Sequence, residues 1–395
     1  MPLSCRLSMR FKMTPVFLLA GPRCSNGGWG SVFGILGLNV PALMRSAAFL
    51  MAGLIAAVLA SPAAADQTDL AARTSGRLAA DLTTHGRFCV QNVGYGPLRL
   101  SSQSPFQSLR LGLMPLTPST LGSGEWEIFW GESLANVWAY SEDAYLIDYE
   151  TLHSRLAVSY GISNTFRVEL FYEERKIFGG ILDDMIVRFH DVFGLDQDGR
   201  DEAPYGEVDV EINTPDGETI VYRDQSGTPT RAVSTVLQHT LTCGGKRRPA
   251  VSYALILRQE LASASPVDRS AYLDVGFTAA VSKRFDEVFL YLTGGYFWYG
   301  DNEIQGVALR KYQLEFLSAL EWRYREDRSL ILQLLAAEGQ VDHFGGFSDY
   351  SYEITLGWKR EFVPGWVAEL GLIENIIVYE NSPDFGLHAG LTWRF

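Results

Sequence analysis

The stretch Asp384-Phe-Gly-Leu-His-Ala-Gly-Leu-Thr-Trp-Arg-Phe395 decides the fold class of this chain. Side chains alternate between the two faces of a β-strand. Every second residue from Phe385 to Phe395 is apolar, while Gly, His, Thr and Arg occupy the positions between them. A soluble strand rarely exposes such an unbroken apolar face, whereas a lipid-facing strand of an outer-membrane β-barrel must do so. The stretch therefore predicts a transmembrane β-barrel, and its aromatic end indicates recognition by the barrel-assembly machinery.

The amino-terminal region has the pattern of a secretory signal peptide. Met44-Arg45 begins a short basic region, 47–60 is apolar, and Ala63-Ala64-Ala65 supplies the small residues of a cleavage site. The apolar run is too short for a transmembrane helix. We predict a signal peptide over 44–65 and the bacterial outer membrane as the destination. A start codon assigned too early accounts for residues 1–43, and an unusually long leader is the alternative.

The chain that would remain after cleavage is acidic. Of the 33 Lys and Arg residues five precede Asp66, and all 46 Asp and Glu residues follow Ala65, which leaves a net charge of −18. No basic stripe is present, so nucleic acid is not an expected partner. No apolar run of helical membrane-span length follows Ala65, which excludes a helical membrane protein. Mean hydropathy is +0.01, which is compatible with a barrel that has an apolar outer face and a polar lumen.

Alternating segments and turn residues beyond position 123 predict twelve antiparallel strands in an up-and-down barrel, and counts from 10 to 14 fit the pattern. The predicted strands are 124–139, 145–160, 165–176, 233–243, 249–260, 271–283, 288–299, 310–324, 329–340, 349–359, 365–379 and 384–395. Short connections alternate with longer ones, as periplasmic turns alternate with external loops. We therefore expect an all-β barrel over 124–395.

Two regions do not read as barrel strands. Residues 92–105 and 115–124 are rich in Gly, Pro and Ser. We therefore expect 66–123 to be an irregular segment that is either a periplasmic tail or a plug. Residues 177–232 form the largest external loop, in which 180–194 has helical spacing of apolar residues and 207–223 resembles a hairpin. The apolar stripe of the helix predicts a lid or plug over the barrel mouth. Its residues are Leu182, Met185, Ile186, Phe189 and Phe193.

The same loop resembles a known family. Phe178-Gly-Gly-Ile-Leu-Asp-Asp-Met-Ile-Val-Arg-Phe-His-Asp-Val-Phe-Gly-Leu-Asp-Gln-Asp-Gly-Arg-Asp201 resembles the signature of a proteobacterial outer-membrane barrel family that is catalogued only as a domain of unknown function. Ser104-Pro-Phe-Gln-Ser-Leu-Arg-Leu-Gly112 and Leu134-Ala-Asn-Val-Trp-Ala139 are similar to its amino-terminal part. The resemblance covers roughly 92–395. It implies the barrel fold and brings no activity and no catalytic residues.

Ionisable residues on the polar faces of the strands are candidate lumen-lining residues. They form either a salt-bridge lattice that fills the barrel or a polar, selective path. The set comprises Arg167, Glu169, Glu315, Glu353, Glu369, His388 and Arg394.

Other chemistry has weaker signals. Cys89 and Cys243 should both lie on the periplasmic side, where a disulfide would attach the amino-terminal segment to the barrel rim, and free thiols are the alternative. No paired-histidine or Cys-x-x-Cys motif predicts a metal site, and no cofactor is expected. His388 has no obvious serine partner, so no catalytic residue is assigned.

These features predict a monomeric barrel for passive transport of a small, partly apolar solute. A structural barrel that binds lipopolysaccharide or an envelope partner is the first alternative, and a membrane hydrolase is the second.

Overall fold

The computed structural model describes Cys89 and most of the chain that follows it. The described ranges are 92–118, 121–141, 144–193, 204–214, 217–245, 247–264, 268–304, 306–341, 344–375 and 381–395. The predicted signal peptide, the residues before it and residues 194–203 after the helix lie outside these ranges.

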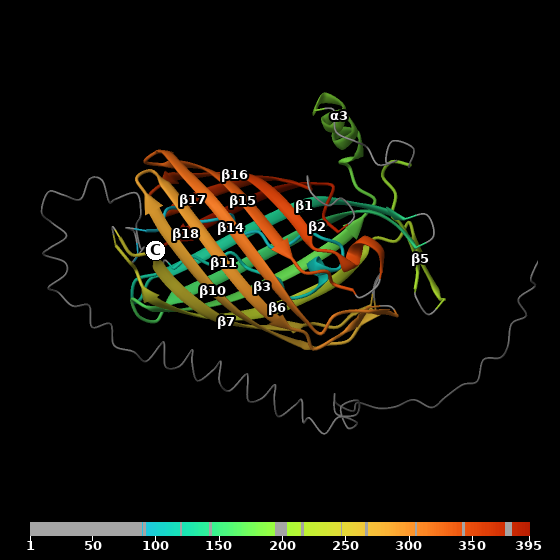
Figure 1. Ribbon diagram of the computed structural model, residues 1–395, viewed down its shortest axis with the longest axis horizontal. Coiled ribbons are helices and arrows are strands. Elements are labelled where there is room, and N and C mark those ends of the chain that lie inside the picture. The colour runs from blue at the N-terminus through green and yellow to red at the C-terminus, as the bar shows by residue number, and fades with distance from the viewer. Residues whose placement is uncertain are drawn as a thin grey trace, which may run out of the picture. The chain divides into compact units, whose positions relative to one another are not determined.

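Twelve long strands form one closed antiparallel barrel (Figure 1), which confirms the predicted fold class and strand number. The first and last strands pair from Glu127↔Arg394 to Asn136↔Phe385, and this pairing closes the sheet. Each of the twelve predicted segments corresponds to one strand. The strands are β1 (Trp126–Ser141), β2 (Tyr145–Gly161), β3 (Phe166–Phe178), β6 (Gly227–Thr242), β7 (Ala250–Glu260), β10 (Leu273–Phe285), β11 (Val288–Trp298), β14 (Tyr312–Arg325), β15 (Arg328–Ala337), β16 (Ser351–Val363), β17 (Trp366–Glu374) and β18 (Phe385–Arg394).

The two ends of the barrel differ in their connections. At one end, which we call the turn end, short turns join the strands, β1 begins and β18 ends. At the other, the loop end, the connections are longer, except for the one that follows β1 at residues 142–144. The large loop between β3 and β6 carries α3 (Asp183–Phe193) and a hairpin of β4 (Asp209–Asn213) and β5 (Thr219–Arg223). The helix and the hairpin were both expected from the sequence.

Two strand boundaries differ clearly from the prediction. β17 ends at Glu374 rather than at residue 379. β6 begins at Gly227 rather than at residue 233, because Gly227 to Thr230 pair with the end of β3. Where β3 ends, β4 takes its place beside β2, from Tyr145↔Ile212 to Asp148↔Asp209. The hairpin therefore extends the barrel wall at the loop end. Smaller elements there are β8 (Ser263–Ala264) with β9 (Asp268–Arg269), β12 (Glu303–Ile304) with β13 (Val307–Ala308), and the 3₁₀ helices η2 (Gln107–Leu109) and η4 (Gly345–Ser348).

The two faces of the barrel wall have opposite chemistry. Large apolar side chains such as Phe316, Leu332 and Leu356 point outward, and each is more than half exposed. Inward positions carry small, aromatic and ionisable side chains, almost all of them buried. An inward charge is buried only if something fills the lumen.

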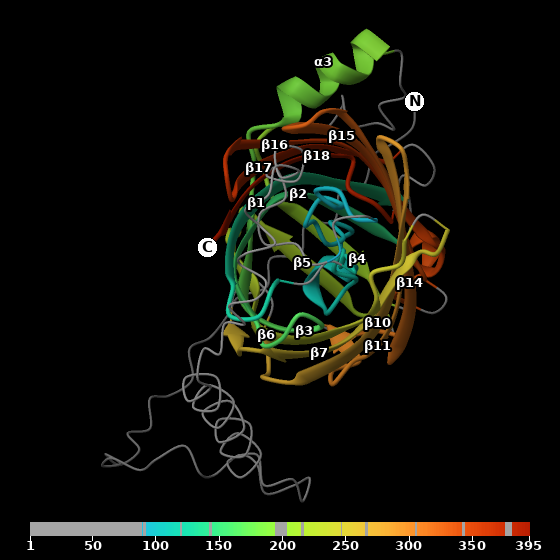
Figure 2. The ribbon, with the colours of Figure 1, turned by 90° about the vertical axis from the view of Figure 1, so that its left-hand side faces the viewer.

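That filling is an irregular segment, residues 92–118, which we call the plug. It lies within the ring of strands in the view along the barrel (Figure 2). The plug enters at the turn end, where the hydroxyl of Tyr95 donates to the carbonyl of Glu326. Its tip reaches the loop end, where Ser104 bonds Asn381, and it returns to the turn end, where Pro118 accepts from Thr240. The described part of residues 66–123 therefore lies mainly inside the lumen.

Candidate functional site

Inward-facing carboxylates bind the backbone of the plug. The plug has no neighbouring strand, and the backbone groups of the barrel are already used in the ladder, so its buried N–H groups need side-chain acceptors. Glu321 accepts from the N–H groups of Tyr95 at 2.9 Å and Gly96 at 3.0 Å. The same carboxylate accepts from the hydroxyls of Tyr291 and Ser329, each at 2.6 Å.

Four further carboxylates, from β10, β14, β16 and β17, repeat this arrangement. The acceptor and donor pairs are Glu369 with Arg99 N at 2.9 Å, Glu353 with Gln103 N at 3.0 Å, Asp274 with Leu111 N at 3.2 Å, and Glu315 with Leu113 N at 2.9 Å. All four carboxylate side chains are buried. The sequence placed Glu315, Glu353 and Glu369 in the lumen, but as members of a salt-bridge lattice or of a polar path. It did not predict their partner, because the plug carries no periodic pattern.

A second network consists of ion pairs between side chains of the barrel wall. Arg258 on β7 is buried and pairs with Glu173 at 2.9 Å, Glu260 at 2.7 Å and Asp274 at 3.4 Å. These pairs join β3, β7 and β10 along one part of the inner wall, where the strand order is β10-β7-β6-β3. Part of the expected salt-bridge lattice is therefore present. A buried charge of this kind is costly unless it is paired and hydrogen-bonded.

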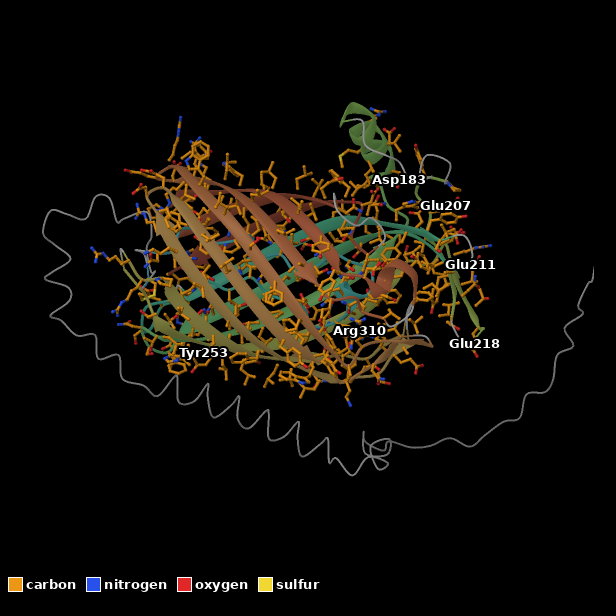
Figure 3. All side chains as sticks on the ribbon, in the orientation of Figure 1. Asp183, Glu207, Glu211, Glu218, Tyr253 and Arg310 are labelled. Atoms are coloured by element: carbon orange, nitrogen blue, oxygen red, sulfur yellow. A yellow bond between two sulfur atoms is a disulfide. The ribbon has the colours of Figure 1, made fainter. Side chains whose placement is uncertain are left out.

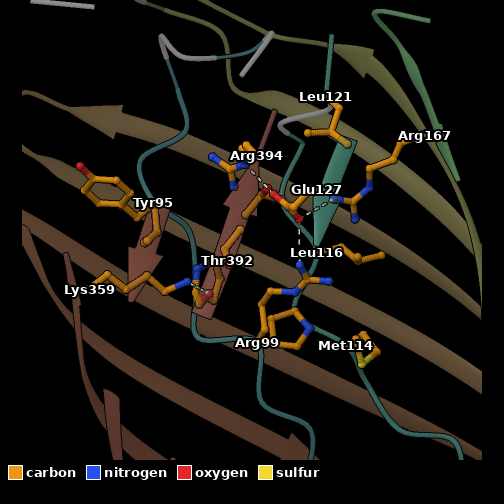
Figure 4. Close-up of a pocket in the computed structure, with 14 residues that line it drawn as sticks. Tyr95, Arg99, Met114, Leu116, Leu121, Glu127, Arg167, Lys359, Thr392 and Arg394 are labelled. Atoms are coloured by element: carbon orange, nitrogen blue, oxygen red, sulfur yellow. Dashed lines mark hydrogen bonds and ion pairs between the residues drawn. The ribbon is translucent and has the colours of Figure 1, made fainter. Parts of the chain in front are cut away.

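Arginines surround a single carboxylate at the turn end (Figure 4). Glu127 lies 2.8 Å from Arg99 of the plug, 2.5 Å from Arg394 and 3.9 Å from Arg167. Glu169 lies 2.7 Å from Arg99 and 3.5 Å from Arg167. The sequence pattern predicted Arg167, Glu169 and Arg394 as lumen residues, but it did not predict Arg99 or Glu127.

Arg99, Glu127, Arg167 and Arg394 border a cavity of about 50 Å³ between the two legs of the plug and the wall. Plug residues Tyr95, Pro97, Met114 and Leu116 line it together with Lys359 and Thr392 of the wall. We call this space the turn-end cavity.

His388 has a serine partner that the sequence did not reveal. The hydroxyl of Ser133 lies 2.8 Å from His388 Nδ1, and Nε2 of the same ring lies 2.9 Å from Glu369 Oε1. Lys359 binds the other oxygen of Glu369 at 2.7 Å. Ser133 and His388 face each other only because β1 pairs with β18, and that register joins opposite ends of the sequence.

An apolar pocket of about 70 Å³ lies at the loop end. Its floor is the tip of the plug, with Phe106 and Leu109, and its walls come from β2, β3, the β4–β5 hairpin and the β12–β13 pair. We call it the loop-end pocket. Its lining residues are Pro105, Phe106, Leu109, Ile147, Tyr149, Ile177, Val208, Val210, Ile212, Ile220, Tyr222, Ile304 and Val307.

A disulfide joins Cys89 to Cys243. Cys243 follows the end of β6 at the turn end, and Asn92 donates to its carbonyl at 2.9 Å. The plug is therefore attached covalently to the rim where it enters the lumen.

The loop helix lies elsewhere than expected. Leu182 and Ile186 are buried against Phe385, Leu134 and Leu372, which belong to the outward faces of β18, β1 and β17. Figures 1 and 2 show α3 outside the ring of strands. These two residues thus contact the outer wall and not the mouth, because the wall offers an apolar surface close to the rim.

The remaining residues of the expected lid are Met185, Phe189 and Phe193. Met185 is 39% exposed, and the side chains of Phe189 and Phe193 lie outside the described parts of the chain. No helix among the described residues is long and apolar enough to cross a membrane.

The chain is similar to several outer-membrane proteins of known structure, and it matches one family model. It is similar to the COG4313 outer membrane channel from Pseudomonas putida F1, with 12% identity, a TM-score of 0.46, and coverage of 72% of this chain and 100% of that one. It is also similar to the KdgM porin in complex with disordered oligogalacturonate, with 9% identity, a TM-score of 0.37, and coverage of 68% and 99%. No curated protein matches the sequence. Residues 87–395 match the family described as "Protein of unknown function (DUF3187)", and the chain belongs to that family.

Proposed function

We propose that this protein is an outer-membrane channel for a small, partly apolar solute, and that the plug closes it. The turn end would face the periplasm and the loop end the exterior. The apolar outer face supports a membrane location, because a lipid-facing wall must be apolar where a soluble barrel is polar. Trp366, Trp393 and Phe395 stack near the turn end, with ring centroids 5.2 and 4.3 Å apart. Such aromatic groups are typical of the membrane interface.

The observation that carries the proposal is the loop-end pocket. Binding sites for small ligands are concave and mostly apolar. Here the apolar side chains come from both the wall and the plug, so a solute in the pocket would contact the segment that blocks its path. Burial of apolar surface stabilises a complex by about 25 cal/mol for each Å² removed from water. The pocket therefore favours an alkyl or aryl group over a sugar.

From the sequence, either the loop helix or residues 66–123 could have taken the plug role. We assign it to residues 92–118. They fill the lumen from one end to the other, and their hydrogen bonds to wall carboxylates are individually breakable. We infer that passage requires the plug to shift within the barrel, while the disulfide keeps its amino-terminal leg at the rim.

Binding of 1-hexanol to the protein in nanodiscs, measured by calorimetry against empty nanodiscs, tests the proposal. Ile220 lines the pocket on β5, and its neighbour Val221 points away and is 46% exposed. We expect saturable binding to the wild type, weaker binding to Ile220→Ser, and wild-type binding to Val221→Ser. Binding no stronger than to empty nanodiscs, or equal loss in both variants, would contradict the proposal.

A membrane hydrolase is a second candidate, and the contacts of Ser133, His388 and Glu369 favour it. A serine beside a histidine that a carboxylate orients is the arrangement of a serine nucleophile. Against it, Ser133 is buried and lines none of the cavities described above. A fluorophosphonate probe distinguishes the two functions: labelling of the wild type that is lost in Ser133→Ala would favour the hydrolase.

An interaction barrel is the remaining alternative, and the acidic β4–β5 hairpin supports it. Glu207, Glu211 and Glu218 lie together on the loop end (Figure 3). Partner binding through this surface would be lost on substitution of Glu211 and Glu218 by Gln, while hexanol binding in the loop-end pocket would persist.

A further inference from the structure

We propose that the solute is an apolar acid, and that the turn-end cavity binds its carboxylate. The inference rests on the proposed channel function and specifies the chemical class of the solute. It is carried by the charges around the cavity, by the free hydrogen-bonding capacity of one buried arginine, and by the apolar part of the lining.

The charged groups around the turn-end cavity do not balance. Four cationic side chains line it: Arg99, Arg167, Lys359 and Arg394. The carboxylates that pair with them are Glu127, Glu169 and Glu369. One positive charge is therefore in excess, inside a chain whose Asp and Glu outnumber its Lys and Arg.

Arg167 carries that excess. The other three cations each lie within 2.8 Å of a carboxylate oxygen. Arg167 lies 3.9 Å from Glu127 and 3.5 Å from Glu169, beyond the 2.7–2.9 Å expected of a charge-assisted hydrogen bond. Its Nε is buried and has no hydrogen-bond partner among the described residues. The residue is 8% exposed, so burial makes an unsatisfied guanidinium costly.

A carboxylate fits this guanidinium better than a neutral group does. The planar fork of arginine donates two parallel hydrogen bonds to a carboxylate, and a bound anion would also neutralise the excess charge. A cavity needs a volume of about 10–15 Å³ to hold one water molecule. The turn-end cavity of about 50 Å³ therefore accommodates a carboxylate and the first carbon atoms of its chain.

The rest of the lining suits the apolar part of such an acid. Met114, Leu116, Leu121 and Val367 border the cavity together with the charged groups. An alkyl or aryl acid would thus meet an apolar pocket at the loop end and a mixed site at the turn end. A neutral hydrocarbon would leave Arg167 unsatisfied, and a small inorganic anion would leave the apolar wall without a partner.

The experiment compares three probes of matched size or charge: hexanoate, 1-hexanol and acetate. Each is titrated by calorimetry into nanodisc-embedded wild type, Arg167→Gln, Arg167→Lys and Arg223→Gln, with empty nanodiscs as the blank. Arg223 lies on the exposed hairpin, where it pairs with Asp209 and Glu211, and serves as the matched control. Heat-modifiable migration in gels verifies that each variant is a folded barrel.

We expect hexanoate to bind more tightly than either hexanol or acetate. Arg167→Gln should weaken hexanoate about tenfold or more, because a hydrogen-bonded charge is lost. It should leave hexanol unchanged, Arg167→Lys should retain part of the hexanoate affinity, and Arg223→Gln should equal the wild type.

Three other outcomes of the titrations would contradict these expectations in different ways. Equal binding of hexanoate and hexanol, unaffected by Arg167→Gln, would overturn the carboxylate site and leave the proposed function standing. Acetate binding as tight as hexanoate would overturn the apolar acid, since only a small-anion site would remain. No saturable binding of hexanoate or hexanol would overturn the proposed function itself.

Discussion

Glu321 on β14 accepts a hydrogen bond from the backbone N–H of Tyr95 at 2.9 Å, across 226 positions of the sequence. The same carboxylate accepts from Gly96, Tyr291 and Ser329. One side chain therefore satisfies two backbone donors of the plug and two hydroxyls of the wall. The attachment of the plug depends on acceptors of this kind rather than on a strand pairing.

Replacing Glu321 by Ala should loosen the plug. The substitution leaves several buried donors without an acceptor, and each such group costs about 1–3 kcal/mol. We expect a lower urea midpoint and a higher single-channel conductance in planar bilayers. Glu287→Ala, at an exposed turn, is the control and should behave as the wild type. An unchanged conductance in Glu321→Ala would show that the plug does not depend on this contact.

Gly94 tests the same contact from the side of the plug. A Cβ at this position would lie 2.3 Å from an oxygen of Glu321, whereas a Cβ at Gly245 would meet nothing within 4 Å. Gly94→Ala should therefore displace the plug or the carboxylate and raise conductance, and Gly245→Ala should not. Equal conductance in the two alanine variants would contradict the close approach.

The Cys89–Cys243 disulfide should hold the amino-terminal leg of the plug at the rim. It closes a loop with a sequence separation of 154, and loss of a native disulfide typically costs about 2–5 kcal/mol. Peptide mapping without reduction should yield one linked peptide. Cys89→Ser with Cys243→Ser should lower stability and increase protease access to the plug. Quantitative alkylation of both thiols in unreduced, denatured protein would reject the bridge.

Ile186 tests the position of α3. Its side chain is fully buried against the outer wall, and the adjacent Met185 is 39% exposed. Ile186→Asp should detach the helix and speed proteolysis of the loop, with conductance unchanged because the helix does not cover the lumen. Met185→Asp should have little effect on either measurement. A rise in conductance in Ile186→Asp would instead support the lid function that the sequence predicted for the helix.

The local sequence pattern was sufficient to predict the strands of the barrel wall. Alternation with a period of two sets both the presence of a strand and the face that each side chain takes. For this reason the sequence indicated the twelve strands and the inward position of Glu315, Glu353 and Glu369. Helical spacing likewise predicted a helix within 180–194, and the turn residues predicted the hairpin beside it.

The local sequence pattern does not determine which side chains contact each other in the folded barrel. The apolar stripe of α3 required an apolar surface, but spacing alone does not distinguish the barrel mouth from the outer wall. Ile186 of α3 packs against the outer wall. Similarly, Ser133 meets His388 only through the register that closes the barrel.

The sequence by itself thus determined a closed antiparallel barrel with a polar, charged interior, because alternation is encoded residue by residue. Only the tertiary structure decided what those charges do. Residues 92–118 have no repeating pattern, and their irregular backbone gains acceptors only when twelve strands surround it. Glu321 then binds Tyr95, Arg99 joins Glu127 to Glu169, and Arg167 is left with capacity for an anion.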